Sequence, residues 1–226
     1  MSKASYVVAI DGPAGAGKST TARAVAKRLG SSYLDTGALY RCVALRALER
    51  GLSLDDGPRV AAVARALVVR FGAGADARVW LDDRDVTAAI RTPEVSHAAS
   101  RVSALPEVRA ALVDLQRSSV RPPGTVAEGR DIGTVIFPNA QLKVFLDADI
   151  EERARRRTAD LGGTGRPDAL AAVRSQMSER DARDTGRLVA PLKPATDAVV
   201  VDTTHLGLDE VVERIVAEAR ARGIGK

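Results

Sequence analysis

The chain has 226 residues, of which 45% are hydrophobic, 28% are charged and 3% are aromatic, and this globular balance excludes global disorder. No apolar run approaches the ~20 residues that a helix needs to cross a bilayer, and no secretion signal precedes the first apolar segment, so we expect a cytoplasmic protein without membrane partners. The net charge of +5 leaves small polyanions and nucleic acid open as ligands, and the single cysteine, Cys42, excludes an internal disulfide.

Short apolar strands alternate with helices along most of the chain. The predicted strands are Tyr6–Asp11, SYLD (32–35), TVAEG (125–129), LKVFLD (142–147) and AVVVD (198–202). The predicted helices are Lys18–Leu29, Ala38–Arg50, about 55–67, 93–119 with a break at Pro106, Ile150–Leu161, Ala169–Asp184 and Leu208–Ala221. Strands that alternate with helices pair in parallel through right-handed crossovers. The pattern therefore predicts a three-layer α/β fold around a five-stranded parallel sheet.

The hydrophobic period changes after about residue 67. Strand-like alternation occurs in LVVRF (67–71), RVWLDD (78–83) and RDVTAAI (84–90). We expect these segments to form a small antiparallel sheet, inserted at about 64–100 into a single domain whose core is 1–63 and 101–226. A basic, glycine-rich stretch, LGGTGRP (161–167), predicts a short flexible lid over about 154–168.

A glycine-rich loop lies between the first predicted strand and the first predicted helix. Its residues, Gly12-Pro13-Ala14-Gly15-Ala16-Gly17-Lys18-Ser19, fit the pattern G-x-x-x-x-G-K-S/T, and this context supports a phosphate-binding loop. We expect the loop, together with Thr20, to hold a nucleoside triphosphate. Lys18 would reach the β- and γ-phosphates, and the Ser19 hydroxyl would ligate Mg²⁺. The chain carries no N-K-x-D segment for guanine, which favours a small kinase over a GTPase.

Charged motifs follow the other strands. DTGALYR (35–41) comes after the second strand, and EGRDIGT (128–134) ends the third. Arg180, Asp184 and Arg187 have the spacing i, i+4, i+7, which places them on one helix face. Ligands of open α/β sheets bind at the carboxyl ends of the strands, so these groups are candidates for a second phosphate site.

The motifs GPAGAGKST, DTGALYR, RTPEV, EGRDIGTVIFP, FLDAD with EERARRR, and ERDARDTGRLVAPL occur in this order. Together they closely resemble the bacterial cytidylate kinases, a family of the nucleoside monophosphate (NMP) kinases, over essentially the whole chain. The resemblance implies transfer of the γ-phosphoryl group of ATP to CMP or dCMP, giving CDP or dCDP. It also makes the inserted unit the NMP-binding domain.

The resemblance further implies a role for individual side chains. Arg130, Arg180 and Arg187 would surround the acceptor phosphate and the transferred group, with Arg41 in the same region. Ser100, Arg109 and Asp131 would recognise cytosine, because a carboxylate accepts from the N4 amino group and arginine donates to O2 or N3. Asp184 would contact the sugar, and Thr36, where the family usually has serine, would position CMP. Glu128, where many relatives have aspartate, would help to organise Mg²⁺. Arg153, Arg155, Arg156 and Arg157 would belong to the lid, with Arg157 contacting ATP.

Two other functions remain open from the sequence. One is a P-loop kinase for another small acceptor, such as UMP. The other is an ATP-switched nucleic-acid-binding protein, which the pI of about 9.7 suggests. The distinctive arginines lie beside phosphate motifs rather than in a continuous stripe with aromatics, so we expect nucleotides and no nucleic acid as partners, and a monomer.

Overall fold

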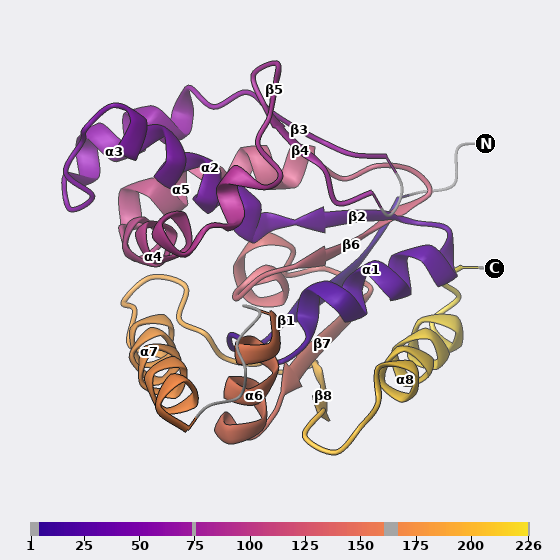
Figure 1. Ribbon diagram of the computed structural model, residues 1–226. Coiled ribbons are helices and arrows are strands. Elements are labelled where there is room, and N and C mark those ends of the chain that lie inside the picture. The colour runs from indigo at the N-terminus through magenta and orange to yellow at the C-terminus, as the bar shows by residue number, and fades with distance from the viewer. Residues whose placement is uncertain (1–4, 74–75, 161–166, 226) are drawn as a thin grey trace.

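A five-stranded parallel sheet forms the centre of the computed structural model, which describes residues 5–73, 76–160 and 167–225 (Figure 1). The strand order is β2-β6-β1-β7-β8. The bounds are Tyr6–Asp11 (β1), Ser32–Asp35 (β2), Gly124–Glu128 (β6), Leu142–Asp147 (β7) and Val199–Asp202 (β8). Every pairing in this sheet is parallel, with Val8 of β1 opposite both Val126 and Leu142. The predicted five-stranded parallel sheet is therefore confirmed, and its carboxyl ends share one edge.

Helices cover both faces of this sheet. On one face, Val8 and Ile10 pack against α1 (Lys18–Leu29) and α8 (Leu208–Ala221). On the other face, Ala9 packs against a five-residue π-helix, Ile132–Ile136, which the sequence did not predict. Two further helices, α6 (Ile150–Asp160) and α7 (Pro167–Thr185), lie beside each other at the carboxyl edge (Figure 1).

A second hydrophobic core lies outside the parallel sheet and runs from Ala38 to Leu112. Its helices are α2 (Thr36–Glu49), α3 (Gly57–Arg65), α4 (Pro93–Val102) and α5 (Pro106–Ser118). Its antiparallel sheet is β3 (Val69–Phe71), β4 (Val79–Leu81) and β5 (Arg84–Asp85). The break predicted at Pro106 separates α4 from α5. The predicted bounds of the insertion, about 64–100, stay a prediction.

The third inserted strand is much shorter than predicted. Only Arg84 and Asp85 of RDVTAAI pair with β4, and a single 3-10 turn follows at Ala89–Arg91. The Thr87 side chain explains this ending. Its hydroxyl accepts a hydrogen bond from the Val79 backbone N–H at 2.9 Å, while the Thr87 N–H donates to the Asp85 carboxylate. Val86 still donates its backbone N–H to the Val79 carbonyl oxygen, but the bond from the Val79 N–H goes to the Thr87 side chain, and the regular ladder ends there.

Two helices begin earlier than predicted. The Asp35 carboxylate accepts from the Ala38 N–H at 2.9 Å, so this N-cap starts α2 at Thr36 rather than Ala38. Pro167 is the first residue of α7, a position that proline tolerates well, where Ala169 was predicted. Residues 161–166 of the predicted lid, including the predicted helix end at Leu161, lie outside the described residues.

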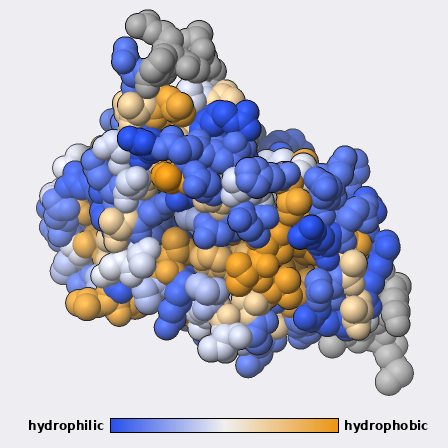
Figure 2. All heavy atoms as spheres, turned by 90° about the horizontal axis from the view of Figure 1, so that it is seen from below, coloured by the Kyte–Doolittle hydropathy of each residue, from blue (hydrophilic) through white to orange (hydrophobic). Residues whose placement is uncertain are grey.

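Polar and charged side chains cover most of the face seen from below, and apolar side chains gather in several places, the broadest near the middle of the view (Figure 2). Val200, on the edge strand β8, is 60% exposed. Within the described part of the chain, no helix is both long and apolar enough to cross a membrane.

Candidate active site

The glycine-rich loop joins the end of β1 to the start of α1. Gly12 leaves the strand with a φ of 149°, and a Cβ atom there would lie 2.0 Å from the Leu146 carbonyl oxygen, so only glycine fits. Gly17 has a φ of 83° and caps α1. The loop therefore wraps the positive N-terminal end of a helix, an arrangement that binds phosphate.

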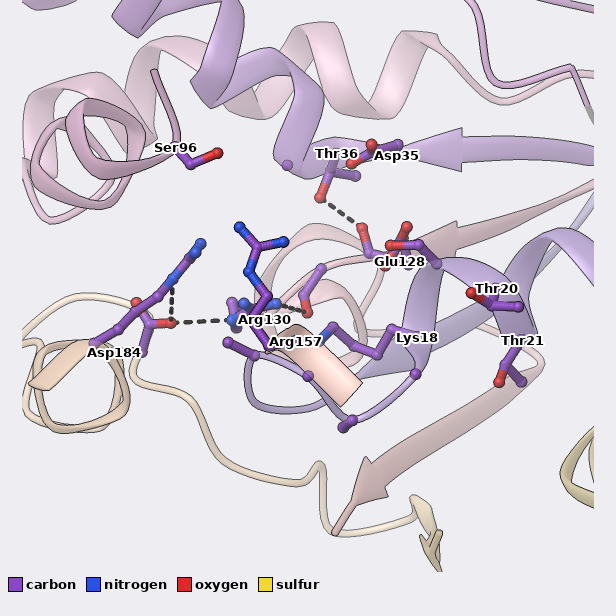
Figure 3. Close-up of a pocket in the computed structure, with 18 of the residues that line it drawn as sticks. Lys18, Thr20, Thr21, Asp35, Thr36, Ser96, Glu128, Arg130, Arg157 and Asp184 are labelled. Carbon is purple, nitrogen blue, oxygen red and sulfur yellow. Dashed lines mark hydrogen bonds and ion pairs between the residues drawn. The ribbon is translucent and has the colours of Figure 1, made fainter. Parts of the chain in front are cut away.

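Lys18 lies at the centre of the site and is buried (Figure 3). Its Nζ donates a hydrogen bond to the Pro13 carbonyl oxygen at 2.6 Å. Burial lowers the pKa of Lys18 well below its usual value, and the Arg130 guanidinium lowers it further. A phosphate bound beside Lys18 would supply negative charge and stabilise its protonated form.

Two acids end the strands next to the loop. Glu128 ends β6, and its Oε1 accepts from the Tyr33 hydroxyl at 2.5 Å. Asp35 ends β2 and pairs with Arg41 at 2.5 Å. Burial, and then the charge of Asp35, raise the pKa of Glu128, which also lies close to the Ser19 hydroxyl. The structure thus brings together the two residues predicted for Mg²⁺.

Three arginines surround the buried carboxylate of Asp184. Its Oδ2 accepts from Arg130 Nε at 3.0 Å, and Arg180 Nε lies 3.9 Å from the same oxygen. Arg187 Nη1 is 3.7 Å from Oδ1. Burial raises the pKa of Asp184, but the arginines, Arg130 first, outweigh it and hold the pKa below its usual value. Burial, and then Arg130, lower the pKa of Arg180 to about 10. Three cations against one acid leave a surplus of positive charge that suits an anion.

A second buried ion pair lies further along the cavity. Arg109 Nη2 donates to Asp131 Oδ2 at 2.5 Å, and both side chains are almost completely buried. The Arg109 guanidinium also lies over the Tyr40 ring, 5.4 Å from its centroid, and donates to the Ser103 carbonyl oxygen. These contacts fix the position of a hydrogen-bond donor beside an acceptor at this end of the cavity.

Asp11 supports this pair from the end of β1. Its two carboxylate oxygens accept from the backbone N–H groups of Ile132 and Gly133, each at 2.8 Å. Burial raises the pKa of Asp11 to about 6. Asp11 therefore anchors the π-helix that follows Arg130 and Asp131, a role that no local sequence pattern predicts.

One cavity of about 770 Å³ joins the phosphate loop to the arginines. The predicted residues that line it are Ala14 to Thr20, Thr36, Arg41, Arg109, Glu128, Arg130, Asp131, Arg157, Arg180, Asp184 and Arg187. Gly12 and Pro13, in the same loop, are buried and are not among the lining residues. Ser100 is buried in α4, where its hydroxyl accepts from Arg183 at 3.4 Å. Its contact with the base stays a prediction.

Several lining residues had no assigned role in the sequence analysis. They include Tyr33, Tyr40, Arg91, Ser96, Ser103 and Thr203. Arg91 begins the RTPEV motif and Ser96 follows it, so that motif was a usable signal. Thr203 enters the cavity only because β8 lies beside β7, which no local pattern shows.

The four arginines that were predicted for the lid have different surroundings. Arg157 lines the cavity (Figure 3). Arg156 also lines it and donates to the Thr203 carbonyl oxygen at 2.6 Å. Arg155 is exposed on α6, and Arg153 is buried. Contact of Arg157 with ATP stays a prediction.

The fold and the cavity together define a class, the P-loop kinases that bring a donor phosphate loop to an arginine-rich acceptor site. The family model for cytidylate kinase matches residues 8–221. A cytidylate kinase of Methylococcus capsulatus is 51% identical over 207 residues, which cover 92% of this chain and 93% of that protein. One from Bordetella bronchiseptica is 51% identical over 218 residues, 96% of each chain. This chain therefore belongs to the cytidylate kinase family.

A likeness of fold extends to more distant proteins. The crystal structure of an uncharacterized protein from Eubacterium ventriosum aligns with 96% of this chain and 99% of that one, with a TM-score of 0.50 and 10% identity.

Proposed function

We propose that this protein transfers the γ-phosphoryl group of ATP to CMP or dCMP, giving CDP or dCDP. One observation carries the proposal. A single cavity holds the phosphate loop at one end and, opposite it, the arginines around Asp184 and the Arg109–Asp131 pair. The membership of the chain in the cytidylate kinase family supports the same acceptor.

The chemistry needs positioning and charge neutralisation more than covalent help. The loop amides and Lys18 bind the β- and γ-phosphates of ATP. Arg130, Arg180 and Arg187 bind the acceptor phosphate and neutralise the transferred group as charge builds on it. Thr36 and Arg41, in the first two turns of α2, support the acceptor. Arg157, within a lid at about 154–168, covers ATP and excludes water.

The acceptor base is recognised through its amino edge. Asp131 accepts from N4 of cytosine, and Arg109 donates to O2 or N3, with Ser100 nearby. Uracil presents a carbonyl oxygen at position 4, which would face carboxylate lone pairs. A buried site that leaves such groups unpaired rejects the wrong base strongly. Asp184 contacts the sugar hydroxyls.

The donor end also suits Mg²⁺. The Ser19 hydroxyl is exposed to the cavity and lies close to Glu128, so both can offer oxygen to the ion. Within the described ranges, no group of three or more His, Cys, Asp or Glu side chains could hold a metal alone, which fits an ion shared with nucleotide phosphates. When bound, Mg²⁺ neutralises the β- and γ-phosphate oxygens.

Replacing Glu128 by glutamine tests this assignment. We expect a higher Mg²⁺ concentration at half-maximal activity, because the neutral amide orders the ion and its waters less well. An unchanged Mg²⁺ dependence would remove Glu128 from the metal site.

The substrate proposal is tested by steady-state phosphorylation of CMP, dCMP, UMP and AMP with ATP as donor. We expect the highest kcat/KM for CMP or dCMP. A clear preference for AMP would contradict the cytosine site, and a preference for UMP would make the protein a kinase of another pyrimidine.

We also propose a monomer that acts in the cytoplasm. One chain lines both ends of the cavity, which supports a single subunit as the active unit. Light scattering after size exclusion, with and without nucleotides, measures the oligomeric state directly.

A further inference from the structure

Arg153, on the first turns of α6, has surroundings unlike those of a lid or surface arginine. Its side chain is 9% exposed. Nε donates to the Ala148 carbonyl oxygen at 2.9 Å. Nη1 donates both to the Ala14 carbonyl oxygen at 3.1 Å and to Asp181 Oδ2 at 2.5 Å. One guanidinium therefore ties the phosphate loop to a carboxylate on α7.

The loop and α7 also touch directly at this point. A Cβ atom added to Gly15 would lie 2.7 Å from Met177 Cε and 2.9 Å from the Arg153 carbonyl oxygen. The tip of the loop is thus packed against α6 and α7 without room for a side chain. Because interiors are close-packed, a shift of the loop here must move its neighbours.

The same helix holds the acceptor groups. Asp181 is followed on α7 by Asp184, one turn later, and Arg180 precedes it. Arg187 lies just beyond the helix end and donates back to the Asp184 carbonyl oxygen at 3.2 Å. The position of α7 therefore sets the positions of two of the three acceptor cations, Arg180 and Arg187.

We propose that Arg153 and Asp181 form a pair of positioning residues, which couples the phosphate loop to the acceptor site. The Ala14 carbonyl oxygen and the Asp181 carboxylate share one donor nitrogen, so a change in the loop when ATP binds is transmitted to α7. Binding of ATP then pre-organises the arginines for the acceptor, and by reciprocity the acceptor favours ATP. This inference rests on the proposed function for the identity of the two ligands.

Three variants separate coupling from simple packing. Arg153→Met keeps a long apolar stem and removes all three hydrogen bonds. Asp181→Asn keeps the shape of the partner and removes its charge, and it serves if Arg153→Met folds poorly. The control is Arg174→Met, which breaks an exposed ion pair with Glu151 between the same two helices and leaves the Arg153 hydrogen bonds in place.

The first measurement is the affinity for CMP by calorimetry, with and without a non-hydrolysable ATP analogue. For the wild-type protein and Arg174→Met we expect the analogue to tighten CMP binding by at least about fivefold. For Arg153→Met and Asp181→Asn we expect this factor to fall to about 1. A purely structural role would lower the unfolding temperature but leave the factor unchanged, and that result would overturn the inference. So would a factor of 1 in the wild-type protein.

The second measurement needs only the donor. We expect the ATP analogue alone to slow amide hydrogen exchange in α7 of the wild-type protein severalfold, and to have no such effect in Arg153→Met. Equal slowing in both proteins would overturn the coupling. A wild-type protein that bound no CMP would contradict the proposed function, and the exchange measurement would still decide on the coupling.

Discussion

We expect Asp131→Asn to lower the ratio of kcat/KM for CMP to kcat/KM for UMP more than it lowers kcat/KM for CMP itself. In the wild-type protein Asp131 Oδ2 accepts from Arg109 at 2.5 Å, which leaves Oδ1 for the base. An asparagine can instead present its amide N–H₂ to the O4 atom of uracil. The wrong base would then gain a partner and the right base would lose one.

The magnitude follows from the burial of the pair. A well-formed base contact discriminates by about 1–3 kcal/mol, which is roughly 5- to 150-fold. The side chains of Arg109 and Asp131 are 6% and 5% exposed, so water competes little and the upper half of this range applies. We therefore expect the ratio of kcat/KM for CMP to that for UMP to fall by about 30- to 150-fold.

The assay is the initial rate of ADP formation with each acceptor, measured on one preparation. Asp131→Asn also weakens a buried ion pair and lowers stability, but both substrates encounter the same folded fraction, so the ratio is unaffected. Asp197→Asn is the control, because Asp197 is exposed and pairs with Lys143 at 2.9 Å. An unchanged ratio in Asp131→Asn, with both rates lowered equally, would refute the reasoning.

Three further outcomes follow from the charged groups. Lys18→Met should lower kcat by about 100-fold or more. The nucleotide-free variant should be at least as stable as the wild type, because the substitution removes a desolvated cation beside Arg130. A large fall in its unfolding temperature would contradict this. Asp184→Ala should lower the free energy of unfolding in urea by about 3 kcal/mol, because it leaves three arginines without their carboxylate. A loss below about 1 kcal/mol would show that these arginines are already solvated. Folding raises the pKa of Asp11 from 3.8 to about 6. The protonated Asp11 side chain therefore adds to the free energy of unfolding below about pH 4, and this contribution is lost as the pH rises through 6. The loss amounts to about 3 kcal/mol. Asp11→Asn should abolish this loss when the two proteins are compared at pH 4 and pH 7, and parallel pH profiles would refute it.

Local signals predicted much of the core from the sequence. β1 and α1 have the predicted bounds because a β-branched run, a glycine-rich turn and a C-terminal glycine, Gly30, mark them without help from the rest of the chain. The alternation in RDVTAAI is typical of a strand, but only its first two residues pair. The ladder ends because the Thr87 hydroxyl accepts from the Val79 N–H and the Thr87 N–H donates to the Asp85 carboxylate.

The groups that escaped prediction depend on distant partners. Asp11 accepts from amides 121 and 122 residues away, and Arg153 reaches a carbonyl group 139 residues away. In the sequence, Arg153 is one of four similar arginines in EERARRR, and nothing local sets it apart. Only the folded chain shows that it faces inward.

A crystal structure with CMP and a non-hydrolysable ATP analogue tests the two-nucleotide cavity most directly. We expect the cytosine amino group within hydrogen-bond distance of Asp131, the CMP phosphate among Arg130, Arg180 and Arg187, and the triphosphate in the loop at Gly12–Ser19. A CMP phosphate bound in the loop itself, with its base away from Asp131 and Arg109, would contradict the assignment of donor and acceptor sites.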